Sequence, residues 1–574
     1  MGSILIRGKL RTLHPSSKIF GRIVICLIII ALGIGYIIGH LTKPAEMIVI
    51  RQEKDFFNTT PSVIVFKEGD MAVAINAYTK SKIAEDINHS YVIQRAIDSL
   101  PDTGGVVFIR AGVYYIYSPI LIQGRTGVRL VGEGVATKLV VKGSDTIAIK
   151  IGDRTDPSKA STNIEVAHLY IDGSDQATED QYPENYDRRF GIEVASPGNE
   201  TRNIYIHDNY IYNTGSDSIY IYGSSDVYVY RNVIEGTRGY WASIHNHGVV
   251  DTDYPGYSHK SVIAFNVIRN SAVSSIRHGK VIIGNIVENS GGRSYDPYPE
   301  AITGGDNSVI AFNTVRGTKT GVSGIGTWRG ENIVVGNTIL NAGKHGIVVR
   351  YNLGSTTPVR GHVIYGNYIY KPAANGIFVT TGSDYTIIQA NKIVKPGMSG
   401  VLFDSAGVNY CQILDNLIVD PADAYNGYNG YGVIIVGNLN TVSRNRLIVT
   451  DTSRIRPEAF IREAGGDYNI IVDNILYPGV SYRQGAILAT GSNTVIKRNI
   501  GYATEASGVA TLPAGSTRVT VSHGLVSAPK KVLITPLAQP PGKLWVENIT
   551  STSFDIVTDT APSADLPVTW YAET

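Results

Sequence analysis

One short phrase recurs from about residue 204 to residue 500. In each copy an Ile or Val is followed three residues later by Asn, and two residues after the Asn comes Ile, Val or Leu, with Gly501 as the exception. The interval between successive Asn residues varies from 19 to 34. A fixed phrase at a variable interval indicates a repeat architecture. The Asn residues are Asn209, Asn232, Asn266, Asn285, Asn313, Asn337, Asn367, Asn391, Asn416, Asn445, Asn474 and Asn499.

The phrase predicts three short strands per repeat. A strand of period 2, a one-residue corner and a second short strand leave no room for a helix. Asn tolerates the left-handed conformation of a sharp corner, and stacked Asn side chains can hydrogen-bond from coil to coil. A second phrase, a small residue followed by Ile or Val as in Gly346-Ile347, supplies the third strand. We therefore predict an all-β protein, a parallel β-helix of about 12 or more coils with an interior of Ile and Val.

The N-terminal end predicts a membrane anchor. Residues 23–41 form a nearly unbroken apolar run, long enough to span a bilayer. Residues 1–22 contain five basic residues and no acidic ones, which predicts a cytoplasmic tail and an extracellular C-terminal bulk at the cell membrane. No small-residue cleavage site follows, so we expect a transmembrane helix that is retained. Residues 42–62 are expected to be a linker.

Residues 63–105 are expected to form a hairpin and a capping helix. Ile93, Ala96, Ile97 and Leu100 fall at i, i+3, i+4 and i+7, the spacing of an amphipathic helix. Its apolar face should cover the open end of the first coil. The β-helix is then expected over 106–504. Over 505–574, alternating strands between turn residues predict a small C-terminal β-sandwich-like module, which either adds a binding site or caps the last coil.

The segment VIQRAIDSLPDTGGVVFIRAGVYYIYSPILI at 92–122, followed by VRLVGEG at 128–134, resembles the N-terminal cap and first coils of the pectate-lyase-like superfamily. Those proteins are single-stranded, right-handed parallel β-helices that include polysaccharide lyases, hydrolases, epimerases and phage tailspikes. With the repeats, the resemblance covers about residues 63–504 and implies a right-handed β-helix. The superfamily also contains non-enzymes, so the resemblance only suggests an activity. It implies a substrate groove along the outward residues of the small-residue strand.

These outward positions change character along the chain. From Glu193 to Arg350 they are mostly ionisable, aromatic or glycine, and long loops rich in aromatic and charged residues flank them. Long loops on a solenoid usually mark its binding face, and aromatic rings can stack on sugars. We predict a saccharide groove over about residues 190–350. Its candidate substrate-binding residues are Glu193, Tyr220, Tyr222, Tyr240, Trp241, Arg293, Tyr295, Trp328 and Arg350.

Two chemistries fit such a groove. A uronate lyase or epimerase needs a cation for the carboxylate, here Arg277 or Arg350, and a base. A hydrolase needs two carboxylates. Asp251 and Asp253 could also hold Ca²⁺ through oxygen ligands. The bases are sought among His245, His247 and Tyr254, and the carboxylates among Glu193, Asp251, Asp253, Asp296 and Glu300.

Beyond this groove the outward column becomes apolar. Six apolar side chains in line would leave an exposed stripe, which usually marks an interface. We therefore expect a homotrimer or a docking surface for the C-terminal module, with cover by the chain's own short loops as the alternative. The column consists of Val348, Phe378, Leu402, Ile434, Ile461 and Leu488.

The predicted function follows from the groove and the anchor. The net charge of +2 does not suggest a nucleic-acid partner. We expect a membrane-anchored, extracellular polysaccharide-binding protein that is a lyase or hydrolase of acidic glycans. The alternative is a non-catalytic adhesin or a structural protein of the cell envelope.

Overall fold

A computed structural model describes residues 60–178, 189–198, 200–239, 241–247, 260–291, 299–327, 330–350, 359–423, 430–450, 457–477 and 485–574. The predicted basic tail, the anchor at 23–41 and nearly all of the linker lie outside these residues. Within them, no helix combines the length and the apolar character needed to cross a membrane.

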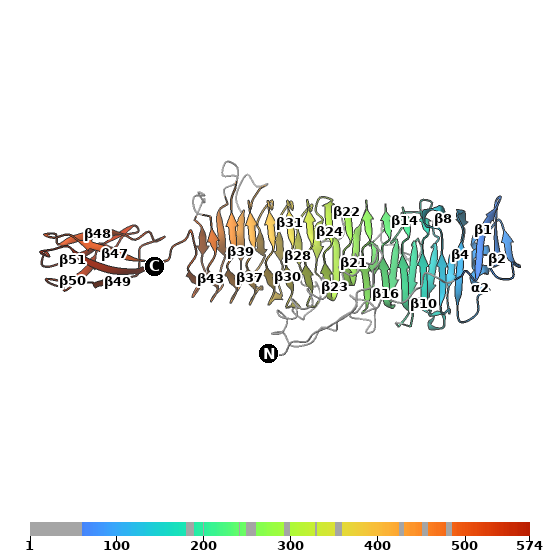
Figure 1. Cartoon of the computed structure of the whole chain (residues 1–574), viewed down its shortest axis with the longest axis horizontal. Coiled ribbons are helices and arrows are strands. Elements are labelled where there is room, and N and C mark those ends of the chain that lie inside the picture. The colour runs from blue at the N-terminus through green and yellow to red at the C-terminus, as the bar shows by residue number, and fades with distance from the viewer. Residues whose placement is uncertain are drawn as a thin grey trace, which may run out of the picture. The chain divides into compact units, whose positions relative to one another are not determined.

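The described chain winds into coils whose strands lie side by side in three parallel ribbons (Figure 1). The ribbon that carries the small-residue phrase is called the first face. Its strands are β6 (Ile120–Ile122), β9 (Ile149–Gly152), β12 (Ile192–Ala195), β15 (Ile219–Tyr222), β18 (Ala242–Asn246), β21 (Ser274–Ile283), β23 (Glu300–Ala311), β25 (Ser323–Gly326), β28 (Ile347–Val349), β32 (Ile377–Val379), β36 (Val401–Phe403), β39 (Tyr431–Ile435), β42 (Ala459–Glu463) and β45 (Ile487–Ala489).

The second face precedes the Asn residues. The long strands β21 and β23 belong to both the first and the second face, so these two ribbons join there into one sheet. The other strands of the second face are β1 (Val63–Glu68), β4 (Gly105–Ile109), β7 (Val128–Val131), β10 (Thr162–Ala167), β13 (Arg202–His207), β16 (Ser225–Tyr230), β19 (Ser261–Ala264), β26 (Ile333–Val335), β30 (Val363–Tyr365), β34 (Ile387–Gln389), β37 (Gln412–Leu414), β40 (Thr441–Ser443), β43 (Ile470–Val472) and β46 (Val495–Lys497).

The third face follows the Asn residues and forms a separate 14-stranded sheet. Its strands are β5 (Gly112–Ile116), β8 (Thr137–Val141), β11 (Tyr170–Asp172), β14 (Tyr210–Tyr212), β17 (Val233–Glu235), β20 (Val267–Arg269), β22 (Ile286–Ser290), β24 (Thr314–Thr318), β27 (Thr338–Leu340), β31 (Tyr368–Tyr370), β35 (Lys392–Val394), β38 (Leu417–Val419), β41 (Arg446–Ile448) and β44 (Ile475–Leu476). Short pieces outside the three faces are η2 (Gly134–Ala136), η3 (Pro157–Lys159) and the paired β29 (Val359–Arg360) and β33 (Ser383–Asp384).

Stacked Ile and Val side chains fill the interior between the three faces. Ile244, Ile276, Ile302 and Ile325 occupy successive coils of the first face, and each is fully buried. Removing such rows from water is the main force that drives a solenoid to stack. The predicted parallel β-helix with an Ile and Val core is therefore present.

The Asn ladder is also present. From Asn209 to Asn474, the backbone N–H of each Asn donates to Oδ1 of the Asn in the next coil, at 2.9–3.1 Å. The expectation that Asn itself adopts the left-handed conformation was wrong. The positive φ falls one residue earlier, as in Phe265 (57°) and Phe312 (54°). This placement lets the Asn side chain turn inward to the ladder.

The small residues of the second phrase are required by close packing. A Cβ on Gly346 would lie 2.5 Å from Cγ2 of Ile369 and 2.6 Å from the carbonyl oxygen of Gly376. Gly376 and Gly400 meet the same two obstacles in the following coils. In these coils the Ile two residues after the Asn therefore packs against a glycine of the first face.

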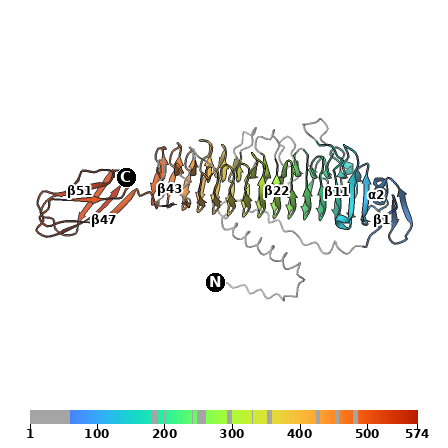
Figure 2. The same ribbon diagram turned by 90° about the horizontal axis from the view of Figure 1, so that it is seen from above.

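A hairpin and a helix cover the N-terminal end of the stack. The strand β2 (Met71–Asn76) pairs antiparallel with β1 and with β3 (Lys82–Asp86). The helix α2 (His89–Asp98) begins after Asn88, whose side chain accepts a hydrogen bond from the backbone N–H of Tyr91. It buries Val92, Ile93 and Ala96 and lies beside β1 in both views (Figures 1 and 2).

The last residues form two antiparallel three-stranded sheets with a core of their own. Leu512, Phe554, Ile556 and Val568 are fully buried within it. One sheet contains β47 (Glu505–Leu512), β49 (Lys531–Pro536) and β52 (Leu566–Glu573), and the other contains β48 (Arg518–Ser522), β50 (Leu544–Glu547) and β51 (Ser553–Thr558).

Candidate functional site on the first face

The structure places four predicted site residues next to one another on the first face. Glu193 pairs in register with Tyr220, Tyr220 with His245, and His245 with Arg277. Their side chains point away from the coil interior, because the Ile residues that alternate with them fill it. The Ca²⁺ hypothesis concerned Asp251 and Asp253, which lie outside the described residues. All the candidates outside the described residues are Tyr240, Asp251, Asp253, Tyr254, Arg293, Tyr295, Asp296 and Trp328.

His245 forms a buried hydrogen bond with Asp217. Its Nδ1 lies 2.9 Å from Oδ2 of Asp217, and both residues are 1% exposed. The other oxygen, Oδ1, accepts hydrogen bonds from the backbone N–H groups of Trp241 (3.2 Å) and Ala242 (2.9 Å). Burial lowers the pKa of His245, and the hydrogen bond to Asp217 opposes that shift. Asp217 was not among the predicted site residues; it lies in the turn before β15, 28 residues before His245.

Aromatic rings surround this pair. The ring of Tyr220 stacks on Phe190 at 4.6 Å and meets the edge of His245 at 5.4 Å. Tyr222 stacks on the predicted catalytic candidate His247 at 5.6 Å. These rings exclude water, which strengthens the hydrogen bonds and ion pairs between them.

Arg277 and Trp241, two further candidates, are also brought together. The Arg277 guanidinium lies 4.9 Å from the centre of the Trp241 ring. A cation over an aromatic face is attracted to it, so Trp241 fixes Arg277 beside His245. The structure therefore gathers an imidazole and a guanidinium on neighbouring strands.

Both candidate carboxylates on the first face are bound to arginines. Oε1 of Glu193 accepts from Nε of Arg154 at 2.6 Å. Glu300 forms an ion pair with Arg350 and accepts a hydrogen bond from Thr303 Oγ1 at 3.2 Å. Arg154 was missed by sequence reasoning because it lies in a turn, 39 residues before its partner.

The candidate column is buried and does not lie in an open groove. Glu193 and Glu300 are each 1% exposed, Arg350 is 4% exposed and Arg277 is 7% exposed. Burying charged groups costs free energy unless each has a partner, and Arg154 and Arg350 supply partners for the two glutamates. The site is therefore a closed cluster of paired charges and rings.

The predicted apolar stripe is largely covered. Val348 is 1% exposed, and the ring of Phe378 stacks on His345 at 4.5 Å. Leu402 and Leu488 are partly buried beside Tyr431. The homotrimer through these residues stays a prediction. The covered stripe does not support it, because the prediction assumed that these side chains are exposed.

The assignment of Ile461 to that stripe was wrong. Ile461 pairs with Val433 and is fully buried in the interior, whereas Arg462 pairs with the outward Ile434. The reason is that Phe460 occupies the position of Gly432 in the preceding coil. Counting from Ala459 as the small residue shifted the expected register by one.

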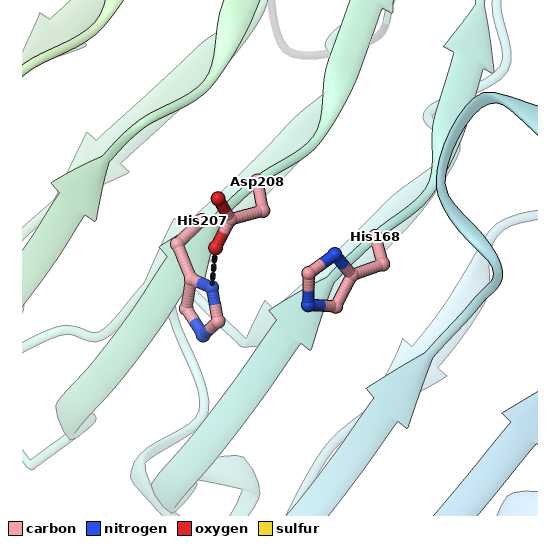
Figure 3. Close-up of side chains that lie close together, drawn as sticks. All are labelled: His168, His207 and Asp208. Atoms are coloured by element: carbon pink, nitrogen blue, oxygen red, sulfur yellow. Dashed lines mark hydrogen bonds and ion pairs between the residues drawn. The ribbon is translucent and has the colours of Figure 1, made fainter. Parts of the chain in front are cut away.

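One group of three possible metal ligands lies within the described part of the chain. His168, His207 and Asp208 each offer an atom within 4.8 Å of the others, on the second face (Figure 3). Sequence reasoning missed the group because its members come from two coils. The only sequence signal was His207-Asp208 directly before an Asn of the ladder.

No protein-family model matches the chain, and no curated protein matches it. Among similar solved structures is the A-module of the mannuronan C-5 epimerase AlgE4 from Azotobacter vinelandii, at 17% identity and a TM-score of 0.39, covering 71% of this chain and 95% of that one. A mutant tailspike protein of E. coli bacteriophage HK620 in complex with a hexasaccharide has 12% identity and a TM-score of 0.48, covering 84% and 89%.

The catalytic domain of a GH87 α-1,3-glucanase in complex with tetrasaccharides is also similar. It has 15% identity and a TM-score of 0.40, covering 64% of this chain and 65% of that one. Likenesses this distant carry no argument about activity, and the fold rests on the strand pairing described above. The chain is a parallel β-helix protein, as its sequence predicted.

Proposed function

We propose that the chain acts on acidic polysaccharides at the first face by removing a proton next to a sugar carboxylate. His245 is the base, Asp217 is its positioning residue, and Arg277 binds the carboxylate. The observation that carries the proposal is the buried hydrogen bond between His245 and Asp217, with Arg277 on the neighbouring strand.

The hydrogen bond determines which nitrogen of His245 can act. An ionised carboxylate only accepts hydrogen bonds, so Nδ1 carries the proton that faces Asp217. Nε2 then carries the lone pair and can take a proton from substrate. The lowered pKa keeps the imidazole neutral at neutral pH, which is the form a base requires.

Arg277 supplies the charge that this chemistry needs. A carbanion beside a carboxylate is stabilised when a cation neutralises that carboxylate. The guanidinium is always charged and can bind a carboxylate through two parallel hydrogen bonds. The electron pair of the carbanion can then form a double bond to the adjacent carbon, while the bond from that carbon to the glycosidic oxygen breaks and the oxygen takes up a proton from solvent. Return of a proton to the opposite side of the carbanion would instead give an epimer.

Hydrolysis through the described carboxylates is less favoured. An inverting or retaining glycosidase needs one carboxyl group that stays protonated as the acid. Arginine beside a carboxylate favours its ionised form, and Glu193 and Glu300 both have such a partner.

We also propose that this face lies outside the cell. It is supported by the apolar segment at 23–41 and the five basic residues before it. A polysaccharide of the cell surface or its surroundings would then lie on the same side of the membrane as the site.

The test uses the full chain on a panel of uronate-containing polysaccharides. Ultraviolet absorbance of the unsaturated product, reducing ends, and exchange of solvent deuterium into the sugar are followed together. We expect either absorbance with new ends or deuterium exchange without cleavage. His245→Gln should lower kcat by about 100-fold or more, because general base catalysis contributes about that much. His345→Gln, a buried histidine of the same face outside the cluster, is the matched control.

New ends without absorbance would mean hydrolysis and would overturn the proposal. Binding of glycan without any reaction would favour an adhesin. The acid limb of the pH profile should lie below the ordinary histidine pKa of 6.5, because protonation of His245 removes the base and its pKa is lowered. A limb at or above 6.5 would contradict the assignment.

A further inference from the structure

We propose that His168, His207 and Asp208 form a binding site for one divalent transition-metal ion of the late first row, such as Zn²⁺. The site lies on the second face, away from His245 and Arg277, and it does not depend on the proposed function. Figure 3 shows the two rings and the carboxylate at the ends of neighbouring strands.

The backbone places the three ligands at one corner of two successive coils. His207 is the last residue of β13, and it pairs in register with Ala167, the last residue of β10. His168 and Asp208 therefore occupy equivalent positions one coil apart, and both have a left-handed backbone, with φ of 57° and 54°. A repeated corner thus aligns side chains that are 40 residues apart in the sequence.

The donor set suits a transition metal. Two imidazoles and one carboxylate are the ligands of several three-residue metal sites that leave a coordination position open. Hard ions such as Mg²⁺ and Ca²⁺ prefer oxygen ligands throughout. The chemistry of the site therefore favours Zn²⁺ and its neighbours.

His207 is already oriented as a metal ligand would be. Its Nε2 lies 3.2 Å from Oε1 of Glu165, and Arg129 holds Glu165 in turn. Metal-binding histidines almost always donate their second N–H to such a carboxylate, which fixes the ring and its tautomer. The ring of Tyr230 stacks on His207 at 4.6 Å and restrains it further.

The position between Nδ1 of His207 and Asp208 is where the ion would bind. Nδ1 lies 2.7 Å from Oδ2 of Asp208 and shares a proton with it. A metal ion replaces this proton, while Arg231 stays bound to Asp208, through Nε to Oδ1 at 2.9 Å and through Nη2 to Oδ2.

His168 completes the set. Its ring meets the ring of His207 edge-on at 6.0 Å, and within the described residues no hydrogen bond engages it. The side chain is half-buried, so solvent reaches it and an ion can enter. A neutral imidazole in this position is available to bind.

The chain offers a matched control at the same corner. Asp473 and Arg498 form the same carboxylate–guanidinium pair in two later coils, with hydrogen bonds of 2.7 and 3.0 Å. Asp473 directly precedes Asn474, and Arg498 directly precedes Asn499, and neither corner contains a histidine. Asp473→Asn therefore removes a comparable ion pair without touching the proposed ligands.

The test is a Zn²⁺ titration of the full chain, purified without a polyhistidine tag, by calorimetry and by competition with a chromogenic chelator. We expect one site per chain. His168→Ala should weaken binding by about 100-fold or more, and Glu165→Gln by about 10- to 100-fold, as for other carboxylates behind a metal-binding histidine. Asp473→Asn should leave the affinity unchanged.

Co²⁺ substitution gives an independent readout. Bound Co²⁺ should show visible absorption bands, and His168→Ala should remove them. Circular dichroism is the control that the variant folds as the wild type does. The proposal is overturned if the wild-type chain binds no Zn²⁺, or if His168→Ala binds it as tightly as the wild type.

Discussion

The two halves of the first face have the same backbone arrangement and differ in their outward side chains. Between Glu193 and Arg350 the outward positions hold paired charges and rings that are buried. From Phe378 to Leu488 they hold apolar side chains except at Arg462, and the chain's own His345 and Tyr431 cover these side chains in part. The interior rows and the Asn ladder run through both halves unchanged.

The comparison distinguishes side chains that stabilise the fold from side chains that are available for binding or chemistry. Apolar cover is a direct source of stability, as in the second half. Buried ion pairs are at best a weak source, because removing two charges from water offsets most of their attraction. The paired charges of the first half are therefore better explained by a role in binding or chemistry than by stability.

Breaking a buried pair in the polar half should have the largest effect. Arg350→Ala leaves Glu300 buried without this partner, and we expect the free energy of unfolding to fall by about 3–5 kcal/mol. Denaturation followed by circular dichroism measures the change. Arg498→Ala, which breaks an exposed pair, is the control and should have little effect. Equal effects from both variants would refute the distinction between the two kinds of pair.

The Asn ladder should matter equally in both halves. Asn266→Ala and Asn416→Ala each leave a buried backbone N–H of the preceding coil without its acceptor. We expect each to lower the free energy of unfolding by about 2–4 kcal/mol, since each removes several buried hydrogen bonds. A clearly larger loss in one half, measured in the same denaturant series, would show that the frame also differs between the halves.

Charges in the apolar half should have the smallest effect. Phe378→Lys combined with Leu402→Glu removes two half-covered apolar groups, so we expect a loss of about 1–3 kcal/mol and an unchanged molecular mass by light scattering. Leu439→Glu, at a residue that is 45% exposed outside this face, is the control. A fall in mass with the double variant alone would instead support the predicted trimer.

The sequence predicted the stack of coils well because each coil repeats the same pattern. The Asn phrase and the Ile rows are local patterns, and each copy indicates the same corner and the same inward side chains. The register of the outward column followed from the same counting as far as Ile434. It failed at Ile461, where Phe460 replaces a small residue and the count begins one position too early.

The partners of the site residues could not be predicted in this way. Asp217 and Arg154 lie in turns, and no repeated phrase determines where a turn of variable length directs its side chains. The same is true of His168 and His207, which approach each other only because two coils of different length return to one corner.

The residues at that corner have a further consequence for how the coils find their order. Because coils built on one phrase resemble each other, a folding chain could skip a coil and still bury its apolar rows. On four successive coils the corner residues are Asp415, Arg444, Asp473 and Arg498. Hydrogen bonds of 2.7–3.0 Å join Arg444 to Asp415 and Arg498 to Asp473. A skipped coil would place Asp against Asp or Arg against Arg. The alternation therefore penalises misassembly, although each exposed pair adds little to the stability of the finished fold.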